Sequence, residues 1–394
     1  MFGFIESWIK RILRRFGLIF VHTFNLPPIA FGYLVLRQDT LSNYKKSTKT
    51  IKSTVFFPLS DFNFKPPINV FDGNTLPIKK VFGRSFFEVQ KRSVEPVELI
   101  EVDNASIVSY YDQWNNEFSM AIDENFAVVP IRSTGFHPAH AKILRTFRPI
   151  SLDIAVAWIF EAWSGNYFHW LVYHIPKAIF FKKKYPSLKL LLPELNSLDS
   201  IIVSSLKMIG YSDEQLIRQP GKYVSIGKLF YLSCDQFDPR LIGKIPEKYS
   251  VFGDIVPKRL VYISRKKAKW RNVINEQEVV EFLFSLGFEI ISMESLSFEE
   301  QVRLMSEAIV LVGPHGAGLA NMVFSPKGLT IVEFVLPSFP NSDYYSLANC
   351  LGHSYGLFLA DHVSDEKEPA LQDMRISIPR LKDLLEEFVF SKIS

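Results

Sequence analysis

From about residue 151 onward, apolar runs of strand length alternate with segments of helical periodicity. This alternation predicts parallel sheets joined by crossover helices. Two series occur, separated near residues 234–258, where Pro, Gly, Asp and Lys interrupt the pattern. The first consists of residues 154–160, 166–183, 188–192 and 197–209, read as strand, helix, strand and helix. The second has strands at residues 260–264, 288–292, 309–312 and 330–336. We therefore expect two α/β units.

Two polar pairs predict helix starts in the second unit. In each pair the first side chain can accept hydrogen bonds from backbone amides of the first turn, and the acid three residues later can accept one from the backbone amide of the first residue. The expected helices end near Gly287 and Ala308. A last helix is expected at residues 379–390, where a stripe of apolar side chains should pack on the body of the protein. The capping pairs are Asn275 with Glu278 and Ser297 with Glu300; the stripe is Leu381, Leu384, Leu385 and Phe388.

Between residues 41 and 150 the apolar runs are short and divided by Pro, Gly, Asn and Asp, which predicts short strands and loops without assignable chemistry. Residues 1–36 form a basic amphipathic segment. Residues 1–20 show helical apolar spacing with clustered Lys and Arg, which favours a helix at a membrane surface. Residues 16–36 lack charge, so a single membrane span is an alternative, although His22, Asn25 and Pro27-Pro28 interrupt them. Packing on the body is the other alternative. No small-residue cleavage site follows this segment, so we do not expect a signal peptide that is removed.

Composition narrows the functional class. A chain of 394 residues with 47% hydrophobic and 22% charged residues is long enough to bury two cores. A net charge of +4, without basic runs interleaved with aromatics, argues against nucleic-acid binding. Cys234 and Cys350 lack metal-ligand spacing and are expected to be ordinary buried thiols in a reducing compartment.

The most informative segment is residues 309–321, where a β-branched apolar run stops at Gly-Pro-His-Gly-Ala-Gly. Glycines let the backbone approach a ligand, and the first amides of a helix attract anions. His315 can add a hydrogen bond or a charge to a phosphate. The alternative is a tight turn in which Gly316 and Gly318 serve packing only.

Two further strand ends carry polar groups. Residues 264–272 place five cations in nine positions after a strand, and arginine can grip phosphate in a bidentate manner. Arg265 is the best placed and Arg271 the second, whereas Lys266, Lys267 and Lys269 have the alternative of a solvated loop. Glu333 stands in an apolar strand and needs a partner, either a ribose diol or an ion pair. Since carboxyl ends of parallel strands share an edge, we expect these groups to converge.

The junction at residues 161–171 carries polar groups among aromatics. His169 lies in the first turn of the helix, where a neutral imidazole can remove a proton from a hydroxyl. The alternative is a satisfied core histidine. His174 faces elsewhere, and His137 and His140 rank lower.

These elements together resemble the glycosyltransferase 61 family over about residues 151–352. The resemblance rests on Gly165-Asn166-Tyr167-Phe168-His169-Trp170-Leu171, Ile263-Ser264-Arg265 with Arg271, Gly313 to Met322, and Val332-Glu333. Bacterial capsular and lipopolysaccharide enzymes belong to this family and, more distantly, plant xylan transferases and animal O-GlcNAc transferases. The resemblance implies a GT-B fold, with two facing Rossmann-like domains, a nucleotide sugar on the C-terminal one, and inverting transfer.

We accordingly expect an N-terminal extension (residues 1–36), an acceptor-side domain (residues 37–240, with its α/β part from about residue 151) and a donor domain (residues 241–394). Asn166 should position the acceptor for His169, the expected general base. No Asp-x-Asp motif is evident, so we expect neither metal nor cofactor. The donor set is Arg265, Arg271, His315, Gly316, Ala317, Gly318, Leu319, Asn321 and Glu333.

The expected substrates are a nucleotide sugar, with UDP favoured, and a glycan or lipid-linked glycan. The expected location is the cytoplasmic face of the inner membrane, with peripheral contact through residues 1–20. Two alternatives stay open: a non-catalytic carbohydrate- or nucleotide-binding subunit, and an enzyme that moves a non-sugar group onto a polysaccharide.

Overall fold

The computed structural model describes residues 33–35, 51–68, 91–111, 117–124, 128–129, 143–145, 149–160, 163–194, 197–250, 256–339, 341–364 and 368–390. Residues 1–20, His137 and His140 lie outside these ranges. Within them, no helix combines the length and apolar content needed to cross a membrane. Three small antiparallel pairs accompany two larger sheets: β1 (Tyr33–Val35) with β7 (Ile143–Arg145), β3 (Ser60–Asn63) with β4 (Lys91–Val94), and β17 (Asp361–His362) with β18 (Met374–Arg375).

The first large sheet has seven strands: β2 (Ile51–Phe57), β5 (Val97–Tyr111), β6 (Glu117–Ile122), β8 (Ile150–Trp158), β9 (Lys189–Leu192), β10 (Leu216–Arg218) and β11 (Tyr223–Ser233). Their order is β10-β9-β8-β11-β5-β2, and β6 pairs with β5. β10, β9, β8 and β11 are parallel, whereas β5 runs antiparallel to β11, β2 and β6. The parallel part confirms the first predicted α/β series.

β5 corrects the expectation that only short strands precede residue 150, because it has 15 residues and pairs with three neighbours. Its acidic residues made the run look interrupted in sequence. Glu101 is nevertheless only 9% exposed, since Lys228 at 2.9 Å and Lys52 at 3.4 Å neutralise its carboxylate. These two lysines come from adjacent strands, so the pairing that makes burial possible is not visible in local periodicity.

A continuous helical stretch follows β8, consisting of α4 (Tyr167–His169), the π-helical turn η2 (Trp170–His174) and α5 (Ile175–Lys184). Pro176 lacks the amide that an uninterrupted α-helix would bond to Val172, which accounts for the wider turn here. α6 (Asp199–Ile209) ends at Gly210, whose φ of 103° suits a glycine cap. The remaining helices of this half are η3 (Asp213–Gln215), α7 (Pro239–Ile242) and α8 (Ile245–Tyr249).

The second large sheet is entirely parallel, in the order β13-β12-β14-β15-β16. Its strands are β12 (Arg259–Ile263), β13 (Glu289–Ile291), β14 (Ala308–Pro314), β15 (Thr330–Val335) and β16 (Ser354–Leu359). The four predicted strands are confirmed, but the prediction ended the unit at residue 336 and missed β16. The direction in which strands are added reverses between β12 and β14, the position where open α/β sheets bind ligands.

Helices cover both faces of this sheet: α9 (Glu276–Ser285), η4 (Met293–Ser295), α10 (Phe298–Ser306), η5 (Ala317–Phe324), α11 (Asp343–Leu351), η6 (Pro369–Leu371), α12 (Ile378–Leu384) and the π-helical η7 (Leu385–Phe390). The capping box at Ser297 and Glu300 is confirmed, with both reciprocal bonds present. The one predicted at Asn275 is wrong. Its amide bonds the backbone N and O of Ile376 instead, so it fixes the C-terminal segment rather than capping α9.

The C-terminal helix packs as predicted, because its four stripe residues are at most 2% exposed. They join the hydrophobic cluster that contains Val310, Val312 and Val332 on one face of the second sheet. The alternate residues Leu311 and Ile331 belong to a larger cluster shared with the first sheet. Burial on both faces explains why these strands read as continuous apolar runs.

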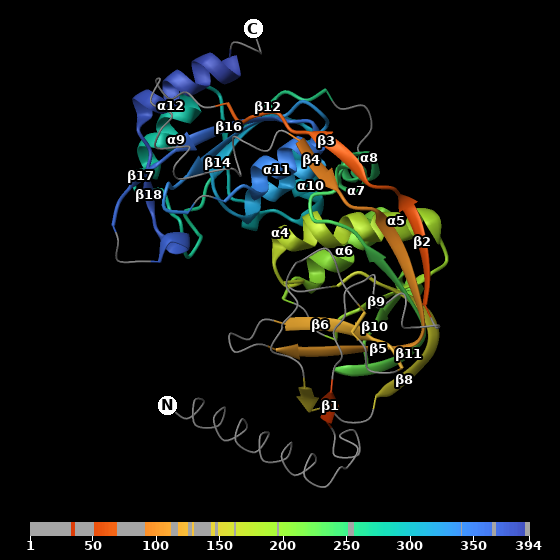
Figure 1. The fold of residues 1–394 in the computed structure, drawn as a ribbon. Coiled ribbons are helices and arrows are strands. Elements are labelled where there is room, and N and C mark those ends of the chain that lie inside the picture. Colours follow the sequence, from red (N-terminus) through yellow and green to blue (C-terminus); the bar gives the residue numbers. More distant parts are fainter. Residues whose placement is uncertain are drawn as a thin grey trace, which may run out of the picture.

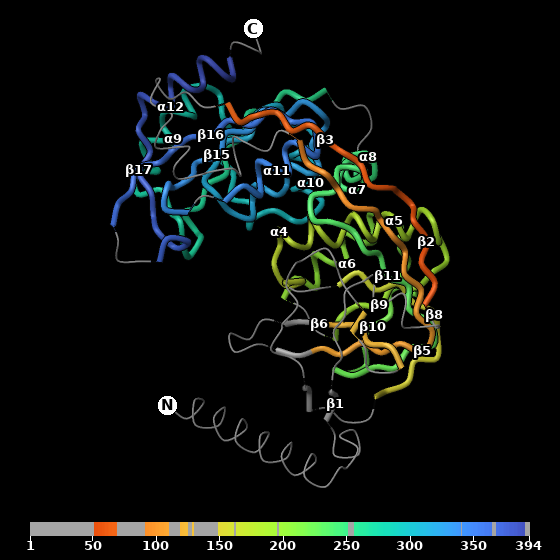
Figure 2. The backbone as a smooth tube through the Cα atoms, in the orientation of Figure 1, coloured from red at the N-terminus to blue at the C-terminus, as the bar shows by residue number. Residues whose placement is uncertain are grey.

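The two sheets are joined by helices and by an early chain segment. α5 and α6 lie between the sheets in Figure 1. The chain after β3 crosses to the second sheet, as Figure 2 shows, and Ile68 makes two backbone hydrogen bonds of 2.9 Å with Tyr355 and Leu357. Residues before position 150 therefore contribute to the packing of both halves.

Candidate functional site

The predicted convergence at the edge of the second sheet is present. β12 ends at Ile263 and β14 at Pro314, and the two strands are direct neighbours. The loops that follow them carry Arg265 and His315, so both residues lie at the reversal point of strand order. Arg265 and His315 are thus close together at one edge of the sheet, although they are fifty residues apart in sequence.

Arg265 lies directly against Gly316. A Cβ atom added to Gly316 would stand 1.9 Å from Nη1 of Arg265, so a side chain at this position would displace the guanidinium. The arginine Nη2 donates to the carbonyl of Trp270 at 2.8 Å. Its Nε is buried and has no hydrogen-bond partner among the described residues. The glycine is therefore required by the arginine, and the arginine keeps a donor available.

Arg271 is held in place from two sides. Its Nε donates to the carbonyl of His315 at 3.0 Å and its Nη1 to the carbonyl of Ala370 at 2.7 Å. Its φ of 56° is unusual for a residue with a side chain, and such conformations persist only where surrounding contacts enforce them. Asn272, next in the chain, is anchored by Asp373 through a 2.9 Å bond to its amide.

In the part of the chain that the structure describes, neither guanidinium group is in an ion pair, and Glu294 and Glu333 act on Arg265 and Arg271 only through longer-range electrostatics. Burial lowers the pKa of Arg265, and the charge of Arg271 lowers it further. Burial is also the main cause that lowers the pKa of Arg271. No carboxylate among the described residues forms an ion pair with either group, whereas Arg259 on the same sheet is paired with Glu289 and Glu307. Two desolvated cations side by side favour an anion as their partner.

The three lysines of this loop behave as the solvated alternative expects. Lys266, Lys267 and Lys269 are exposed. Lys267 donates to Ser295 at 3.0 Å, and Lys269 lies over the Trp270 ring at 4.8 Å.

His315 is fixed by a buried carboxylate. Its Nδ1 lies 2.5 Å from Oε1 of Glu333, and the Tyr355 hydroxyl donates to Oε2 of the same residue at 2.5 Å. Glu333 is 0% exposed and both its oxygens are occupied, so the expected contact with a ribose is corrected. Glu333 instead orients the imidazole, which leaves Nε2 as the ring nitrogen for an outside partner.

The amide groups after His315 divide into used and remaining donors. The His315 amide bonds Phe334 at 2.9 Å, and the Leu319 amide bonds Gly316 at 3.0 Å. The prediction that the Leu319 amide binds the nucleotide sugar is therefore corrected. The amides of Gly316, Ala317 and Gly318 precede the first hydrogen bond within η5 and keep the geometry of a helix start.

Asn321 is also corrected as a donor-binding residue. It is 0% exposed, and its Nδ2 donates to the carbonyl of Gly318 at 2.9 Å. Its Oδ1 lies 2.7 Å from the hydroxyl of Tyr167, which is also 2.7 Å from Oε1 of Gln301. Asn321 thus fixes the glycine turn and connects it to α4.

The start of α11 contributes residues that the sequence analysis missed. The Tyr344 ring packs against His315 at 5.0 Å and against Phe168 at 5.4 Å, and so lies between the two halves. Asp343 has its pKa raised mainly by burial, and His315 counteracts part of that rise. The acid also acts electrostatically on Tyr173 of η2. The polar-aromatic run Asn341-Ser342-Asp343-Tyr344, where α11 begins, was the available signal.

His169 belongs to the first unit, at the end of α4, and aromatic rings surround it. The centre of its ring is 6.2, 5.5 and 4.9 Å from the ring centres of Trp163, Phe168 and Tyr173. Burial lowers its pKa to about 4, so the imidazole is neutral near pH 7. Its Nδ1 is buried without a hydrogen-bond partner in the described part of the chain. Phe168 and Tyr344 connect this side to His315.

Asn166 serves first as the N-cap of α4. Its Oδ1 accepts from the amides of Phe168 at 3.0 Å and His169 at 3.4 Å. It therefore fixes the backbone that carries His169. His174 is fully buried, and its Nδ1 lies 2.8 Å from the carbonyl of Ile159, so it belongs to the core.

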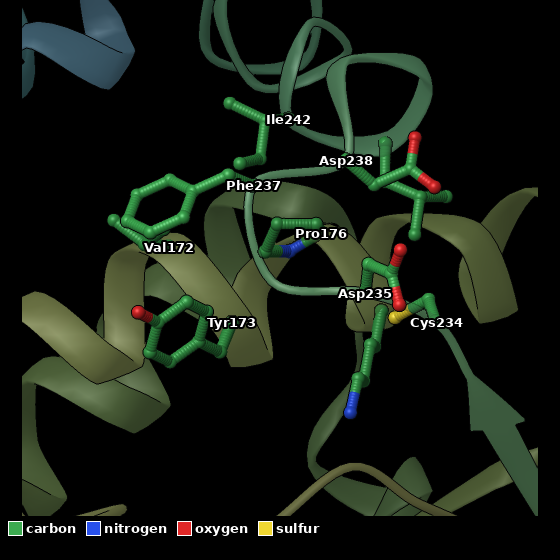
Figure 3. Close-up of a pocket in the computed structure, with 10 residues that line it drawn as sticks. Val172, Tyr173, Pro176, Cys234, Asp235, Phe237, Asp238 and Ile242 are labelled. Carbon is green, nitrogen blue, oxygen red and sulfur yellow. The ribbon is translucent and has the colours of Figure 1, made fainter. Parts of the chain in front are cut away.

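A small cavity adjoins this wall, where Tyr173 and Phe237 pack with ring centres 5.9 Å apart (Figure 3). Its volume of about 10 Å³ is close to that of one water, which is too small for a sugar. Lys177 lines it, with a pKa lowered to about 8 by burial. Cys234 and Cys350 are buried thiols, as predicted.

Comparisons with known proteins give a family for this part of the chain. A family model described as Glycosyltransferase 61 matches residues 167–332, from α4 to β15. The dog Protein O-linked-mannose beta-1,4-N-acetylglucosaminyltransferase 2 is 38% identical over 79 residues, which is 19% of this chain and 13% of that protein. The Drosophila melanogaster EGF domain-specific O-linked N-acetylglucosamine transferase is 34% identical over 100 residues, 25% and 19% of the two chains.

A plant relative is similar at the same level. Alpha-1,3-arabinosyltransferase XAT3 of Oryza sativa subsp. japonica is 32% identical over 104 residues, which is 25% of this chain and 18% of the relative. In each case the match spans less than a fifth of the relative's length.

Proposed function

Because the chain belongs to the glycosyltransferase 61 family, we propose that it transfers a sugar from a nucleotide donor, UDP-linked, to a hydroxyl of a glycan acceptor with inversion at the anomeric carbon. The observation that carries this proposal is the pair of half-buried arginines, Arg265 and Arg271, beside His315 and the helix-start amides of the glycine turn. The names of the relatives mention N-acetylglucosamine, which is a hexose derivative, and arabinose, which is a pentose. We therefore propose a hexose or a pentose as the transferred sugar.

The donor diphosphate is assigned to this edge of the second sheet. Departure of the nucleotide leaves negative charge on the phosphate that loses the sugar. Arg265 and Arg271 neutralise that charge in a desolvated setting, where electrostatic stabilisation is strongest. His315 Nε2 and the amides of residues 316–318 supply hydrogen bonds, while Glu333 and Tyr355 keep the imidazole in its orientation.

The acceptor is assigned to the opposite side, in the cleft of a GT-B arrangement with the first unit as acceptor domain. A neutral His169 can accept the proton of the attacking hydroxyl. A base with a pKa of about 4 is weak, but the charge of a bound nucleotide would raise it toward neutrality. Asn166 holds the turn that presents His169.

Arg265→Ala tests the donor site. A charge-assisted hydrogen bond contributes about 1.5–3 kcal/mol, so UDP should bind roughly 10- to 100-fold more weakly in calorimetry. Lys266→Ala is the matched control, because Lys266 is the next residue in the chain and its side chain is exposed. This variant should change the affinity for UDP by less than about twofold. Equal affinity of wild type and Arg265→Ala would remove Arg265 from the donor site.

His169→Ala tests the catalytic base. It should lower kcat by about 100-fold or more, the usual contribution of general base catalysis, while the Kd of UDP stays unchanged. Asp343→Asn is the companion variant, because Asp343 is a half-buried acid at the same interface and is the alternative candidate for the catalytic base. Full transfer by His169→Ala together with loss in Asp343→Asn would assign the base to Asp343.

The biological setting belongs to the same proposal. We place the protein at the cytoplasmic face of a bacterial inner membrane, in the synthesis of a capsule or lipopolysaccharide, with residues 1–20 as a peripheral anchor. A basic amphipathic start suits an enzyme that acts on lipid-linked glycans. Liposome co-sedimentation with and without residues 1–20 tests the anchor, and equal binding of the two forms would discard it.

A further inference from the structure

A second hollow lies on the first unit and shares no lining residue with the proposed donor site. It is formed by α5, α7, α8 and the end of β2, and has a volume of about 580 Å³. Its floor is apolar and consists of Phe57, Pro176, Ile179, Phe180 and Leu241. Its rim carries six cations and one acid, Glu247, and the six cations are Lys182, Lys183, Lys184, Arg240, Lys244 and Lys248.

Most of this positive charge is not neutralised within the protein. Arg240 is bound by Asp238 at 2.7 Å, and Lys244 by Glu247 at 2.9 Å. The other four lysines form no ion pair with a carboxylate among the described residues. Lys182 has a pKa lowered by burial and further by the charge of Lys248, which shows that like charges act on one another here.

Two exposed apolar side chains are close in sequence to Phe57, which lines the groove. Val55 and Leu59 flank Phe57 in the chain and are 55% and 59% exposed. Lys184 lies over the Phe56 ring at 5.4 Å, so basic and apolar groups are interleaved. A soluble anion requires the lysines alone. A lipid surface satisfies both kinds of group, because phosphates meet the cations and apolar side chains enter the interface.

We propose that this basic groove, with the lysines Lys182, Lys183, Lys184 and Lys248, and the exposed Val55 and Leu59 on either side of its lining residue Phe57 in the chain, bind the surface of a bilayer that contains anionic phospholipid. The lysines contact lipid phosphates, and Val55 and Leu59 enter the headgroup region. The groove would hold the first unit, the proposed acceptor side, against the membrane. The groove contains none of residues 1–20 and does not depend on the sugar-transfer reaction.

Vesicle flotation with the full chain tests the charge requirement. Vesicles of phosphatidylcholine alone are compared with vesicles of equal parts phosphatidylcholine and phosphatidylglycerol. Reversal of three exposed lysines, K183E, K184E and K248E, should lower binding to the anionic vesicles by about tenfold or more, since each basic residue adds roughly threefold to fivefold. The control reverses three exposed lysines elsewhere, K222E, K258E and K327E, and should retain most of the binding. Equal losses in the two triple variants would overturn the proposal.

A site-specific probe separates this groove from residues 1–20. An environment-sensitive dye is attached at Leu59→Cys and, as a control, at Phe284→Cys on α9, where the native side chain is 72% exposed. Native thiols should label poorly, because burial raises the pKa of Cys234 to about 11 and also that of Cys350. Anionic vesicles should shift the emission to the blue at position 59 only. Unchanged emission at position 59 on floated protein, or the same shift with inorganic pyrophosphate and no vesicles, would refute membrane contact here.

Discussion

At the scale of single residues, the proposed donor site depends on the contact between Arg265 and Gly316. The guanidinium occupies the space that a side chain at position 316 would need, with a would-be Cβ only 1.9 Å from Nη1. Glycine here makes room for a charged group, and this packing role is compatible with the predicted approach of the backbone to a ligand. The two interpretations that the sequence left open, packing turn and anion site, are therefore compatible.

Gly316→Ala should act through Arg265. The added methyl displaces the guanidinium, so UDP should bind about 10- to 100-fold more weakly, as in Arg265→Ala. The double variant should bind no more weakly than either single one, because the same interaction is already lost. Gly318→Ala is the milder comparison, since its Cβ would meet Cγ2 of Ile263 at 3.1 Å. Additive losses in the double variant would show that Gly316 acts independently of Arg265.

At the scale of elements, one tyrosine connects α4 with two helices of the second unit. The hydroxyl of Tyr167 reaches both Gln301 of α10 and Asn321 of η5. Asn321 also bonds Gly318, so the helix that carries His169 and the glycine turn after His315 share one polar network. This network fixes the spacing between the proposed acceptor and donor walls.

Tyr167→Phe should destabilise the protein by about 1–3 kcal/mol, because the buried amide oxygens of Gln301 and Asn321 lose the single hydroxyl proton that they share. Urea unfolding measures this loss. Tyr185→Phe, a change of the same chemistry at a partly exposed tyrosine, should cost less than about 1 kcal/mol. We also expect a lower kcat/KM in Tyr167→Phe, since the two walls would no longer be held in register. Stability equal to the control would mean that solvent replaces the hydroxyl.

At the scale of the whole molecule, the protein buries several neutral histidines. Burial lowers the pKa of His169 to about 4, of His174 to about 3 and of His353 to about 4. His174 and His353 are at most 4% exposed. In the unfolded chain these side chains bind protons near pH 6.5. Between about pH 6.5 and 4 the unfolded state therefore binds more protons, and folding stability falls as the pH falls.

We predict acid-labile folding, with full stability above about pH 6.5 and a loss of roughly 2 kcal/mol per buried histidine by pH 5. Urea titrations at pH 7 and pH 5 measure it. The combined variant His174→Asn, His353→Gln should flatten this dependence, because each amide can keep the hydrogen bond to Ile159 or Met322 without titrating. A pH dependence that is as steep in the variant as in wild type would contradict this origin.

Local sequence determined much of this protein. Periodicity predicted four of the five strands in the second sheet, and the capping box at Ser297 depends on residues only three positions apart. The convergence of Arg265 and His315 was also predictable, because carboxyl ends of adjacent parallel strands share an edge whatever the side chains are.

Only the tertiary structure decided which polar groups remain available. Glu333, Leu319 and Asn321 stood in the predicted donor set, but packing gives each an internal partner. Likewise β5 buries Glu101 with lysines from other strands, and Tyr344 reaches His315 from a helix outside every motif. Periodicity records which face of an element is buried. Hydrogen-bond and charge partners come from distant segments, so they are settled when the elements pack together.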